Sequence, residues 1–145
     1  MVIREVHKDD LKQLLELYTQ LHDNLMPQFD KKLEKLWDSI LLDKNHHIIV
    51  GFVADKLISS CVLVIIPNLT HNLRPYALIE NVITREGYRE KGYATSVLNF
   101  ARNLAKKENC YKLMLLTSAK KESTLNFYEK AGYSRHDKTA FIQWI

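Results

Sequence analysis

The strongest constraint on the fold comes from the distribution of glycine. The chain has only four glycines, and two of them, Gly87 and Gly92, lie within six residues of each other. A mostly apolar run that ends at Thr84 precedes this pair, and a helical pattern follows it. Glycine at a strand-to-helix turn adopts backbone angles that other residues avoid and lets a ligand approach the main chain. The sequence therefore predicts a β-strand that turns tightly into a helix, with room for a ligand at the turn.

Apolar periodicity on either side of this turn extends the unit to a mixed α/β domain. Strands are predicted over residues 2–6, 46–54, 57–66, 76–84, 111–117 and 141–145, and helices over residues 11–21, 29–41, 92–109 and 122–131. The order is β-α-α-β-β-β-α-β-α-β, with room for one more strand near the end. A chain of 145 residues can bury one core, so we expect a single domain over residues 1–145 with one sheet.

Two of these segments allow more than one role. The apolar stripe over residues 29–41 fits a core face, which we favour, or a lid over a substrate. The segment over residues 139–145 is expected to form an exposed sheet edge. Such an edge can pair with a second copy of the chain, which allows a homodimer.

The net charge indicates which kinds of cofactor or macromolecule the chain can bind. The net charge is +4 and the isoelectric point is about 9.0, which suits a small polyanionic cofactor as well as a nucleic acid. The basic residues are spread along the chain without an arginine-rich arm, so no nucleic-acid partner is expected. Cys61 and Cys110 make neither a disulfide framework nor a zinc cluster. Neither a signal-peptide pattern nor an apolar run of bilayer length is present, so we expect a cytoplasmic protein without a membrane partner.

The segment from Arg89 to Ala94 combines features that attract an anion. A helix that begins near Gly92 presents unpaired N–H groups and the positive end of its dipole. Arg89 and Lys91 add full positive charge. The alternative is an ordinary strand-to-helix turn with solvated basic residues. The nucleotide-binding patterns GxxxxGK[ST] and GxGxxG are both absent.

Two motifs resemble those of the GNAT family of N-acetyltransferases. Arg89-x-x-Gly92-x-Ala94 resembles the family's R/Q-x-x-G-x-G/A signature, and the stretch FYEKAGY at residues 127–133 resembles its FYEKxGF element. Residues 79–82 and 110–112 are similar to the glucosamine-phosphate N-acetyltransferase branch of the family. In motif detail the resemblance covers residues 77–133.

The resemblance implies a mostly antiparallel central sheet flanked by helices, with acetyl-coenzyme A as co-substrate. It also implies that main-chain N–H groups of residues 89–94 hold the pyrophosphate, and that the strands over residues 76–84 and 111–117 diverge around the pantetheine arm. No HExxH pattern occurs, so no metal is expected. The residues expected to contact coenzyme A are Val82, Ile83, Thr84, Arg89, Glu90, Lys91, Gly92, Tyr93, Ala94 and Asn126.

Two residues are candidates for the chemistry of acetyl transfer. Tyr128 resembles the family's tyrosine that protonates the coenzyme thiolate, and a phenol with a pKa of about 10 is protonated at neutral pH. The alternative is a core aromatic side chain that packs on Phe127. Glu80 interrupts an apolar strand, where burial would raise the pKa of the carboxylate and suit it to accept the amine proton. The alternative for Glu80 is an ion pair with a basic residue such as Arg74.

Asn81 and Arg74 are the candidates for acceptor binding. Strand alternation places Glu80 on the face of Leu78 and Val82, and Asn81 on the opposite face. Arg74 lies in the polar loop that precedes this strand. Neither cysteine lies in a motif for a covalent intermediate, so we expect direct transfer, in a ternary complex, to the primary amine of a small molecule. A protein or peptide amine as acceptor, or a chain that binds coenzyme A without catalysis, are the alternatives.

Overall fold

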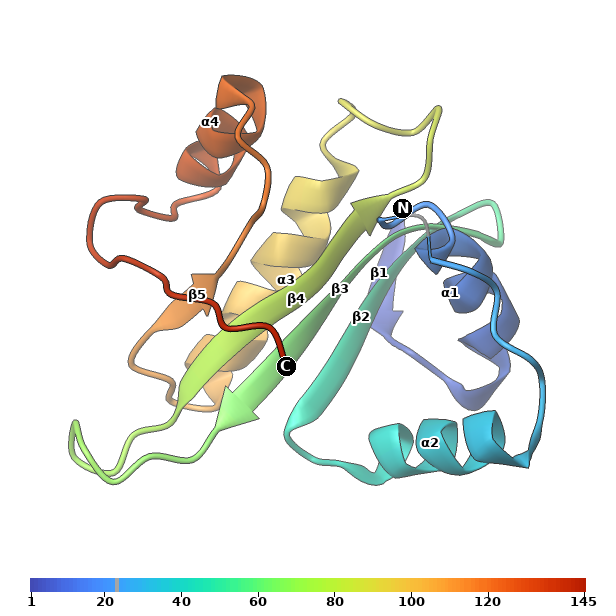
Figure 1. The fold of residues 1–145 in the computed structure, drawn as a ribbon, viewed down its shortest axis with the longest axis horizontal. Coiled ribbons are helices and arrows are strands. Elements are labelled where there is room, and N and C mark those ends of the chain that lie inside the picture. The colour runs from blue at the N-terminus through green and yellow to red at the C-terminus, as the bar shows by residue number, and fades with distance from the viewer. Residues whose placement is uncertain (23) are drawn as a thin grey trace.

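The computed structural model describes residues 1–22 and 24–145 and contains one sheet with the strand order β1-β2-β3-β4-β5. All neighbouring strands are antiparallel except β4 and β5, which are parallel (Figure 1). The strands are β1 (Val2–Glu5), β2 (His46–Val53), β3 (Lys56–Ile66), β4 (Tyr76–Thr84) and β5 (Leu113–Leu115). The helices are the short 3-10 helix η1 (Lys8–Asp10), α1 (Leu11–Tyr18), α2 (Lys31–Leu42), α3 (Tyr93–Lys107) and α4 (Glu122–Lys130).

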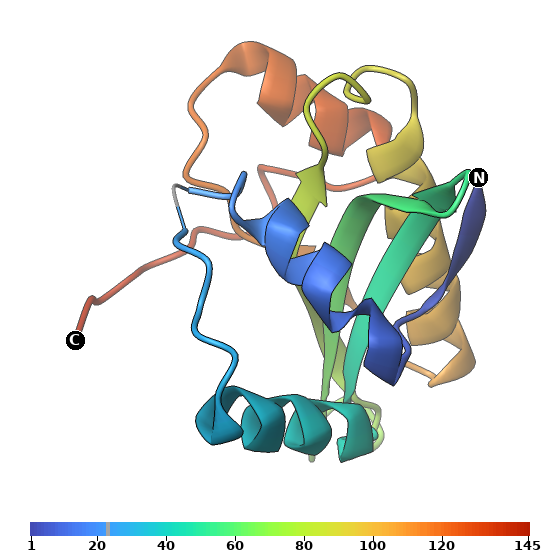
Figure 2. The same cartoon turned by 90° about the vertical axis from the view of Figure 1, so that its right-hand side faces the viewer.

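The two faces of the sheet are covered by different helices. The amphipathic helix α3 packs one face, where Val97, Leu98 and Ala101 are buried against strand residues such as Ile79. Helices α1 and α2 lie on the other face, where Leu14 and Leu17 of α1 and Trp37 of α2 are buried (Figure 2). The stripe over residues 29–41 is therefore a core face only in part, because Phe29 and Leu36 are more than half exposed. No helix within the described ranges is both long and apolar enough to cross a bilayer.

The mixed α/β fold with one mostly antiparallel sheet is confirmed, but the predictions near the C-terminal end were partly wrong. The strand predicted over residues 111–117 is only Leu113–Leu115. Residues 141–145 form no strand, and the side chains of Phe141 and Trp144 are 91% and 90% exposed. In Figures 1 and 2 this segment leaves the sheet on the side of α1 and α2. Alternation indicates that a segment can form a strand, but a strand also needs a neighbouring chain to pair with.

A bulge in β4 changes the direction of the side chains that follow it. Val62 of β3 pairs with Glu80 of β4, and Ser60 of β3 pairs with Ile83 of β4. Between these two pairs β3 advances by two residues but β4 by three, so β4 contains one extra residue. The extra residue is Asn81, whose φ of 50° lies in the left-handed region that asparagine tolerates better than most residues. The extra residue reverses the alternation, so Val82 packs on the α3 side of the sheet. The expectation that Glu80 shares a face with Val82 was therefore wrong.

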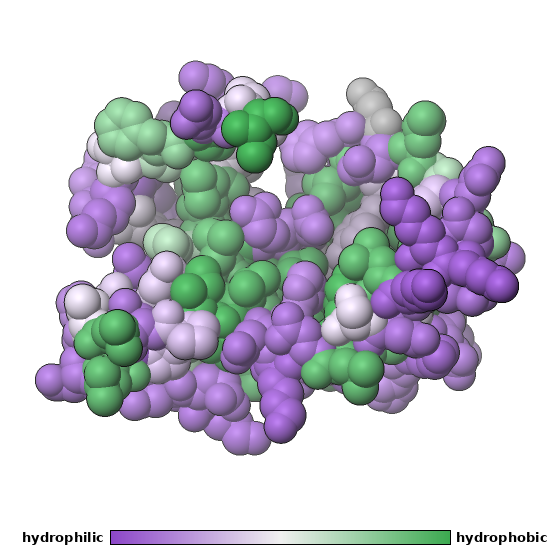
Figure 3. All heavy atoms as spheres, turned by 60° about the horizontal axis from the view of Figure 1, so that its bottom comes forward, coloured by the Kyte–Doolittle hydropathy of each residue, from purple (hydrophilic) through white to green (hydrophobic). Residues whose placement is uncertain are grey.

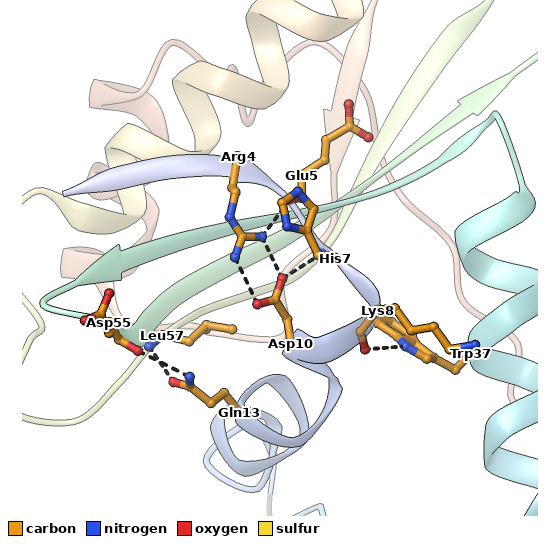
Figure 4. A network of polar contacts seen from close by, with 9 residues as sticks. All are labelled: Arg4, Glu5, His7, Lys8, Asp10, Gln13, Trp37, Asp55 and Leu57. Carbon is orange, nitrogen blue, oxygen red and sulfur yellow. Dashed lines mark hydrogen bonds and ion pairs between the residues drawn. The ribbon is translucent and has the colours of Figure 1, made fainter.

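A polar network joins β1 to the first helices (Figure 4). Asp10 is only 8% exposed, and its carboxylate accepts two hydrogen bonds from the Arg4 guanidinium, at 2.6 and 2.9 Å, and one from the main-chain N–H of His7, at 2.6 Å. Trp37 of α2 donates its indole N–H to the carbonyl of Lys8, at 3.0 Å. These contacts fix α1 and α2 against the N-terminal strand. In the sequence, Asp10 was only an acidic residue at a helix start.

Candidate functional site

A cavity of about 490 Å³ lies between the second half of β4, the turn that follows it, the start of α3 and the helix α4. Its lining residues are Val82, Ile83, Thr84, Tyr88, Arg89, Glu90, Gly92, Tyr93, Ala94, Thr95, Ser123, Thr124, Phe127 and Tyr128. Both sequence motifs, which are more than thirty residues apart, therefore meet at one cavity. A second cavity, of about 180 Å³, lies between the end of α2 and the start of β2 and contains none of the predicted site residues.

The cavity begins where the pairing of β4 with β5 ends. The two strands pair only from Ala77 with Leu113 to Ile79 with Leu115, although β4 continues to Thr84. Beyond Ile79, the edge of β4 on this side has no strand partner within residues 1–22 and 24–145. Main-chain N–H and C=O groups on such an edge can pair with an extended ligand, although the carbonyl of Thr84 already accepts a hydrogen bond from Arg89.

The turn between β4 and α3 presents an array of free main-chain donors. Gly92 caps α3 with a φ of 81°, and Glu90 has a φ of 62°, so both are left-handed. The N–H groups of residues 89–95 make no hydrogen bond to any residue that the structure describes. The first helical bond runs from the N–H of Ser96 to the carbonyl of Gly92, at 3.1 Å. Free donors together with the positive end of a fifteen-residue helix make a site for an anion.

The basic residues of the turn are held in different ways. The Nε of Arg89 donates to the carbonyl of Thr84, at 3.2 Å, so the guanidinium is tethered at the rim of the cavity. The Nζ of Lys91 donates to the carbonyl of Gly87, at 2.9 Å, and Lys91 is not a lining residue. The structure thus places Arg89 at the cavity and turns Lys91 back toward its own loop.

Tyr128 reaches the cavity from α4 within an aromatic cluster. Its ring centroid lies 5.0 Å from that of Phe127 and 6.3 Å from that of Tyr133, which it meets edge to face. Burial raises the pKa of the Tyr128 phenol, and the charge of a nearby Cys61 thiolate would raise it further. Because both effects oppose ionisation, Tyr128 holds its proton at neutral pH and can donate it.

Glu80, Asn81 and Arg74 do not line the cavity. Glu80 is exposed, so the burial expected from its apolar neighbours in the sequence is not found. The expected alternative, an ion pair with Arg74, is not formed either. Arg74 instead donates to the carbonyls of Asn109 and Cys110, each at 3.1 Å, at the far end of β4. Asn81 is exposed beside Glu80.

Helix α4 carries Asn126, which was predicted to contact coenzyme A. The first turn of α4 carries two residues that line the cavity but were not predicted from the sequence. Asn126 is exposed and does not line the cavity. Ser123 and Thr124 do line it, as does Thr95 at the start of α3. A search for hydroxyl residues in the first turn of each helix near the motifs would have found all three.

The comparisons with known proteins agree with this geometry. The sequence model of the acetyltransferase (GNAT) family matches residues 10–133, so the chain belongs to the acetyltransferase (GNAT) family. The chain is 30% identical over 83 residues to a glucosamine 6-phosphate N-acetyltransferase of Trypanosoma brucei brucei. That match covers 57% of the chain and 54% of the relative, so the chain spans about half the length of this relative.

Solved structures, including the following two, also resemble the chain over nearly its whole length. A protein of Agrobacterium tumefaciens that is assigned as an acetyltransferase has a TM-score of 0.91 and 33% identity, over 99% of this chain and 100% of that one. The glucosamine-6-phosphate N-acetyltransferase of Arabidopsis thaliana has a TM-score of 0.84 and 24% identity, over 99% and 97%. The second likeness is one of fold. The family and the fold expected from the sequence are thereby confirmed.

Proposed function

We propose that the chain transfers an acetyl group from acetyl-coenzyme A to a primary amine of a small molecule, directly and in a ternary complex. The observation that carries this proposal is the array of free N–H groups over residues 89–95, capped by Gly92, that opens into a cavity with Tyr128 on its other side.

The residues around the cavity suit the parts of coenzyme A. The donor array and the Arg89 guanidinium suit a diphosphate, which needs several N–H groups and positive charge. The free edge of β4 at Val82, Ile83 and Thr84 suits the amides of a pantetheine arm, which can pair with it as a strand would. Glu90, Tyr93 and Ala94 complete the wall beside the diphosphate. Lys91 and Asn126 remain candidates for outer contacts with the nucleotide.

The two functional groups of the reaction would approach from opposite sides of β4. The amine nitrogen attacks the thioester carbonyl, the C–S bond breaks, and the departing sulfur receives a proton from Tyr128. The amine proton passes to Glu80, directly or through water, because its carboxylate is exposed on the face that α1 and α2 leave open. Free N–H groups on the edge of β4 would stabilise the carbonyl oxygen as it gains charge.

The shape of the surface and one relative support a small molecule as the acceptor. Seen from the end that carries α2, the surface is hollowed, and hydrophobic side chains lie beside the hollow (Figure 3). An amino sugar is the first candidate, because the T. brucei brucei relative is named for glucosamine 6-phosphate. Asn81 and Arg74 are the proposed acceptor contacts. The alternatives are a protein or peptide amine and a module that binds coenzyme A without catalysis.

Two measurements test the proposed function. Isothermal titration calorimetry with acetyl-coenzyme A should show saturable binding with one site. A screen of amino sugars, polyamines and peptide amines, followed by release of free thiol, should identify an acceptor, and the same assay with Glu80→Gln reports whether the carboxylate takes the proton. No heat of binding at millimolar acetyl-coenzyme A would overturn the proposal, whereas binding without turnover on any amine would leave the non-catalytic alternative.

Gly92→Ala is expected to weaken acetyl-coenzyme A binding roughly tenfold, since a Cβ at a φ of 81° costs about 1 kcal/mol and shifts the donor array. Calorimetry measures the change in Kd. Gly87→Ala is the matched control, because Gly87 has a φ of 79° and equally open surroundings but does not line the cavity. Both variants should lose similar thermal stability, and equal losses of affinity would argue against a special role for Gly92.

We also propose that the chain forms a homodimer through residues 139–145. Phe141, Ile142 and Trp144 are at least 60% exposed, and Ile142 and Trp144 would share one face of an extended segment. The outer edge of β5 has no strand neighbour among the residues described. Burying two large aromatic side chains per copy removes roughly 300–500 Å² from water, a substantial driving force for pairing.

Trp144→Lys is expected to convert a dimer into a monomer in sedimentation velocity experiments, because the charge cannot be buried in the interface. Leu69→Lys is the control, since Leu69 is 88% exposed but lies in the loop before β4. A wild-type chain that sediments as a monomer at its highest soluble concentration would contradict the dimer.

A further inference from the structure

Two buried hydroxyl groups have no hydrogen-bond partner within the part of the chain that the structure describes. They are the phenol oxygen of Tyr18, at the end of α1, and the Oγ of Ser60, in β3. Ser60 is fully buried. The neighbouring residue Ser59 is equally buried, but its Oγ donates to the carbonyl of Ile83, at 3.0 Å, and lies 2.9 Å from the Oγ1 of Thr84. Ser60 is therefore an exception within its own strand.

Neither hydroxyl group gains a hydrogen bond of standard geometry for the hydration that it loses on burial. A buried polar group without a partner costs about 1–3 kcal/mol, so Phe at position 18 and Ala at position 60 would suit this interior better. The surrounding cluster is otherwise apolar and includes Leu14, Leu17, Val62 and Ile83. Proteins retain groups of this kind mainly where function needs them.

The two hydroxyl groups lie beside the bulge of β4. Ser60 pairs with Ile83 at the point where the register shifts, and the extra residue there is Asn81, next to Glu80. Burial raises the pKa of Tyr18 to about 12, and the side chains of Ser60 and Asn81 are close enough to oppose that rise. The Tyr18 phenol thus has a buried hydroxyl and an amide near it. Asn81 itself is exposed on β4.

We propose that Tyr18 and Ser60 are positioning residues, whose hydroxyl groups hold the side-chain amide of Asn81 toward the acceptor amine beside Glu80. The proposal rests on the proposed acetyltransferase function. Ser60 would donate to the Tyr18 oxygen, and the Tyr18 hydroxyl would donate to the amide oxygen of Asn81. The amide nitrogen of Asn81 is then directed toward the acceptor. Hydrogen bonds of this kind are often long in unliganded enzymes and shorten when substrate binds.

Tyr18→Phe and Ser60→Ala test the proposal together. Each is expected to keep or raise the Tm and to leave the Kd for acetyl-coenzyme A unchanged, while kcat/KM for the acceptor falls roughly 10- to 100-fold. Asn81→Gly keeps a residue that accepts a φ of 50° but removes the amide, and should show the same loss. The double variant Tyr18→Phe/Asn81→Gly should lose little more than either single variant, because the residues act as one unit. Ser59→Ala, which breaks real hydrogen bonds, should instead lower the Tm.

A readout that does not need turnover separates this proposal from the proposed function. The side-chain amide signals of Asn81 in ¹⁵N-correlated NMR spectra should shift in Tyr18→Phe and in Ser60→Ala. If both signals and kcat/KM match those of the wild type, the hydroxyl groups merely pack and the positioning role is overturned. If the wild-type chain transfers no acetyl group, the proposed function fails. In that case the NMR signals of Asn81 still test the contact of Asn81 with the two hydroxyl groups. Shifted signals in the variants would support this contact, and unshifted signals would overturn it.

Discussion

Replacing Tyr128 by Phe is expected to lower kcat for acetyl transfer roughly 100-fold and to leave the Kd for acetyl-coenzyme A unchanged. The phenol lines the cavity, and its raised pKa keeps it protonated, so it can supply the proton that the departing thiolate needs. Phenylalanine keeps the ring and its packing on Phe127 but removes this proton. Steady-state kinetics at saturating acetyl-coenzyme A and calorimetry measure the two quantities.

The pH dependence adds a second criterion for Tyr128. Its pKa lies above the ordinary value of about 10, so the phenol stays protonated throughout the neutral range. Tyr128→Phe should therefore lower kcat by the same factor across that range. Tyr133→Phe is the matched control, because Tyr133 packs edge to face on Tyr128 but does not line the cavity. A Tyr128→Phe variant with the kcat of the wild type would mean that the ring only packs.

Asp10→Asn is expected to lower the free energy of unfolding by about 3 kcal/mol at neutral pH. The carboxylate is nearly fully buried and accepts three hydrogen bonds, two of them from the Arg4 guanidinium, so the amide would leave this cation without its counter-ion. Urea denaturation at neutral pH measures the loss. Asp9→Asn is the control, since the exposed Asp9 precedes it in the same turn and should change stability by less than about 0.5 kcal/mol.

The loss should depend on pH with a definite sign. The hydrogen bonds and charge of Arg4 lower the pKa of Asp10 in the folded state, although burial acts in the opposite direction. Its stabilisation is therefore complete above the unfolded pKa of about 4 and is lost as the pH falls through the lower, folded pKa. The difference between wild type and Asp10→Asn should be constant near neutral pH and shrink in acid. A difference that persisted unchanged in strong acid would contradict the ion pair as its source.

The types of the main elements could be predicted from the sequence because they depend on local pattern. The strand over residues 76–84 and the helix that follows Gly92 match the bounds of β4 and α3 closely. The predicted strands over residues 46–54 and 57–66 correspond to β2 and β3, and Ala54 and Asp55 at the turn between them both have positive φ. Neighbouring residues alone set these features, through side-chain alternation and backbone angles.

The anion-binding half of the candidate site was also visible in the sequence, whereas the acceptor half was not. The donor array depends on Gly92 and a helix start, both of which are local. The environment of Glu80 depends on what packs above it, and the structure leaves it exposed where an apolar run had suggested burial. The bulge at Asn81 also moves the side chains of the residues after it to the opposite face of the sheet. The local sequence pattern does not predict an extra residue in one strand of a pair.

The sequence by itself thus determined most of the elements, the family motifs and the residues of the turn between β4 and α3, because each is a property of adjacent residues. Only the tertiary structure decided which distant groups meet. It brought Tyr128 to the same cavity as Gly92, joined Asp10 to Arg4, and buried the Tyr18 and Ser60 hydroxyl groups. It also left residues 141–145 without a strand partner among the residues that the structure describes. Contacts between distant segments depend on how the sheet stacks against its helices, and periodicity within one segment carries no information about that.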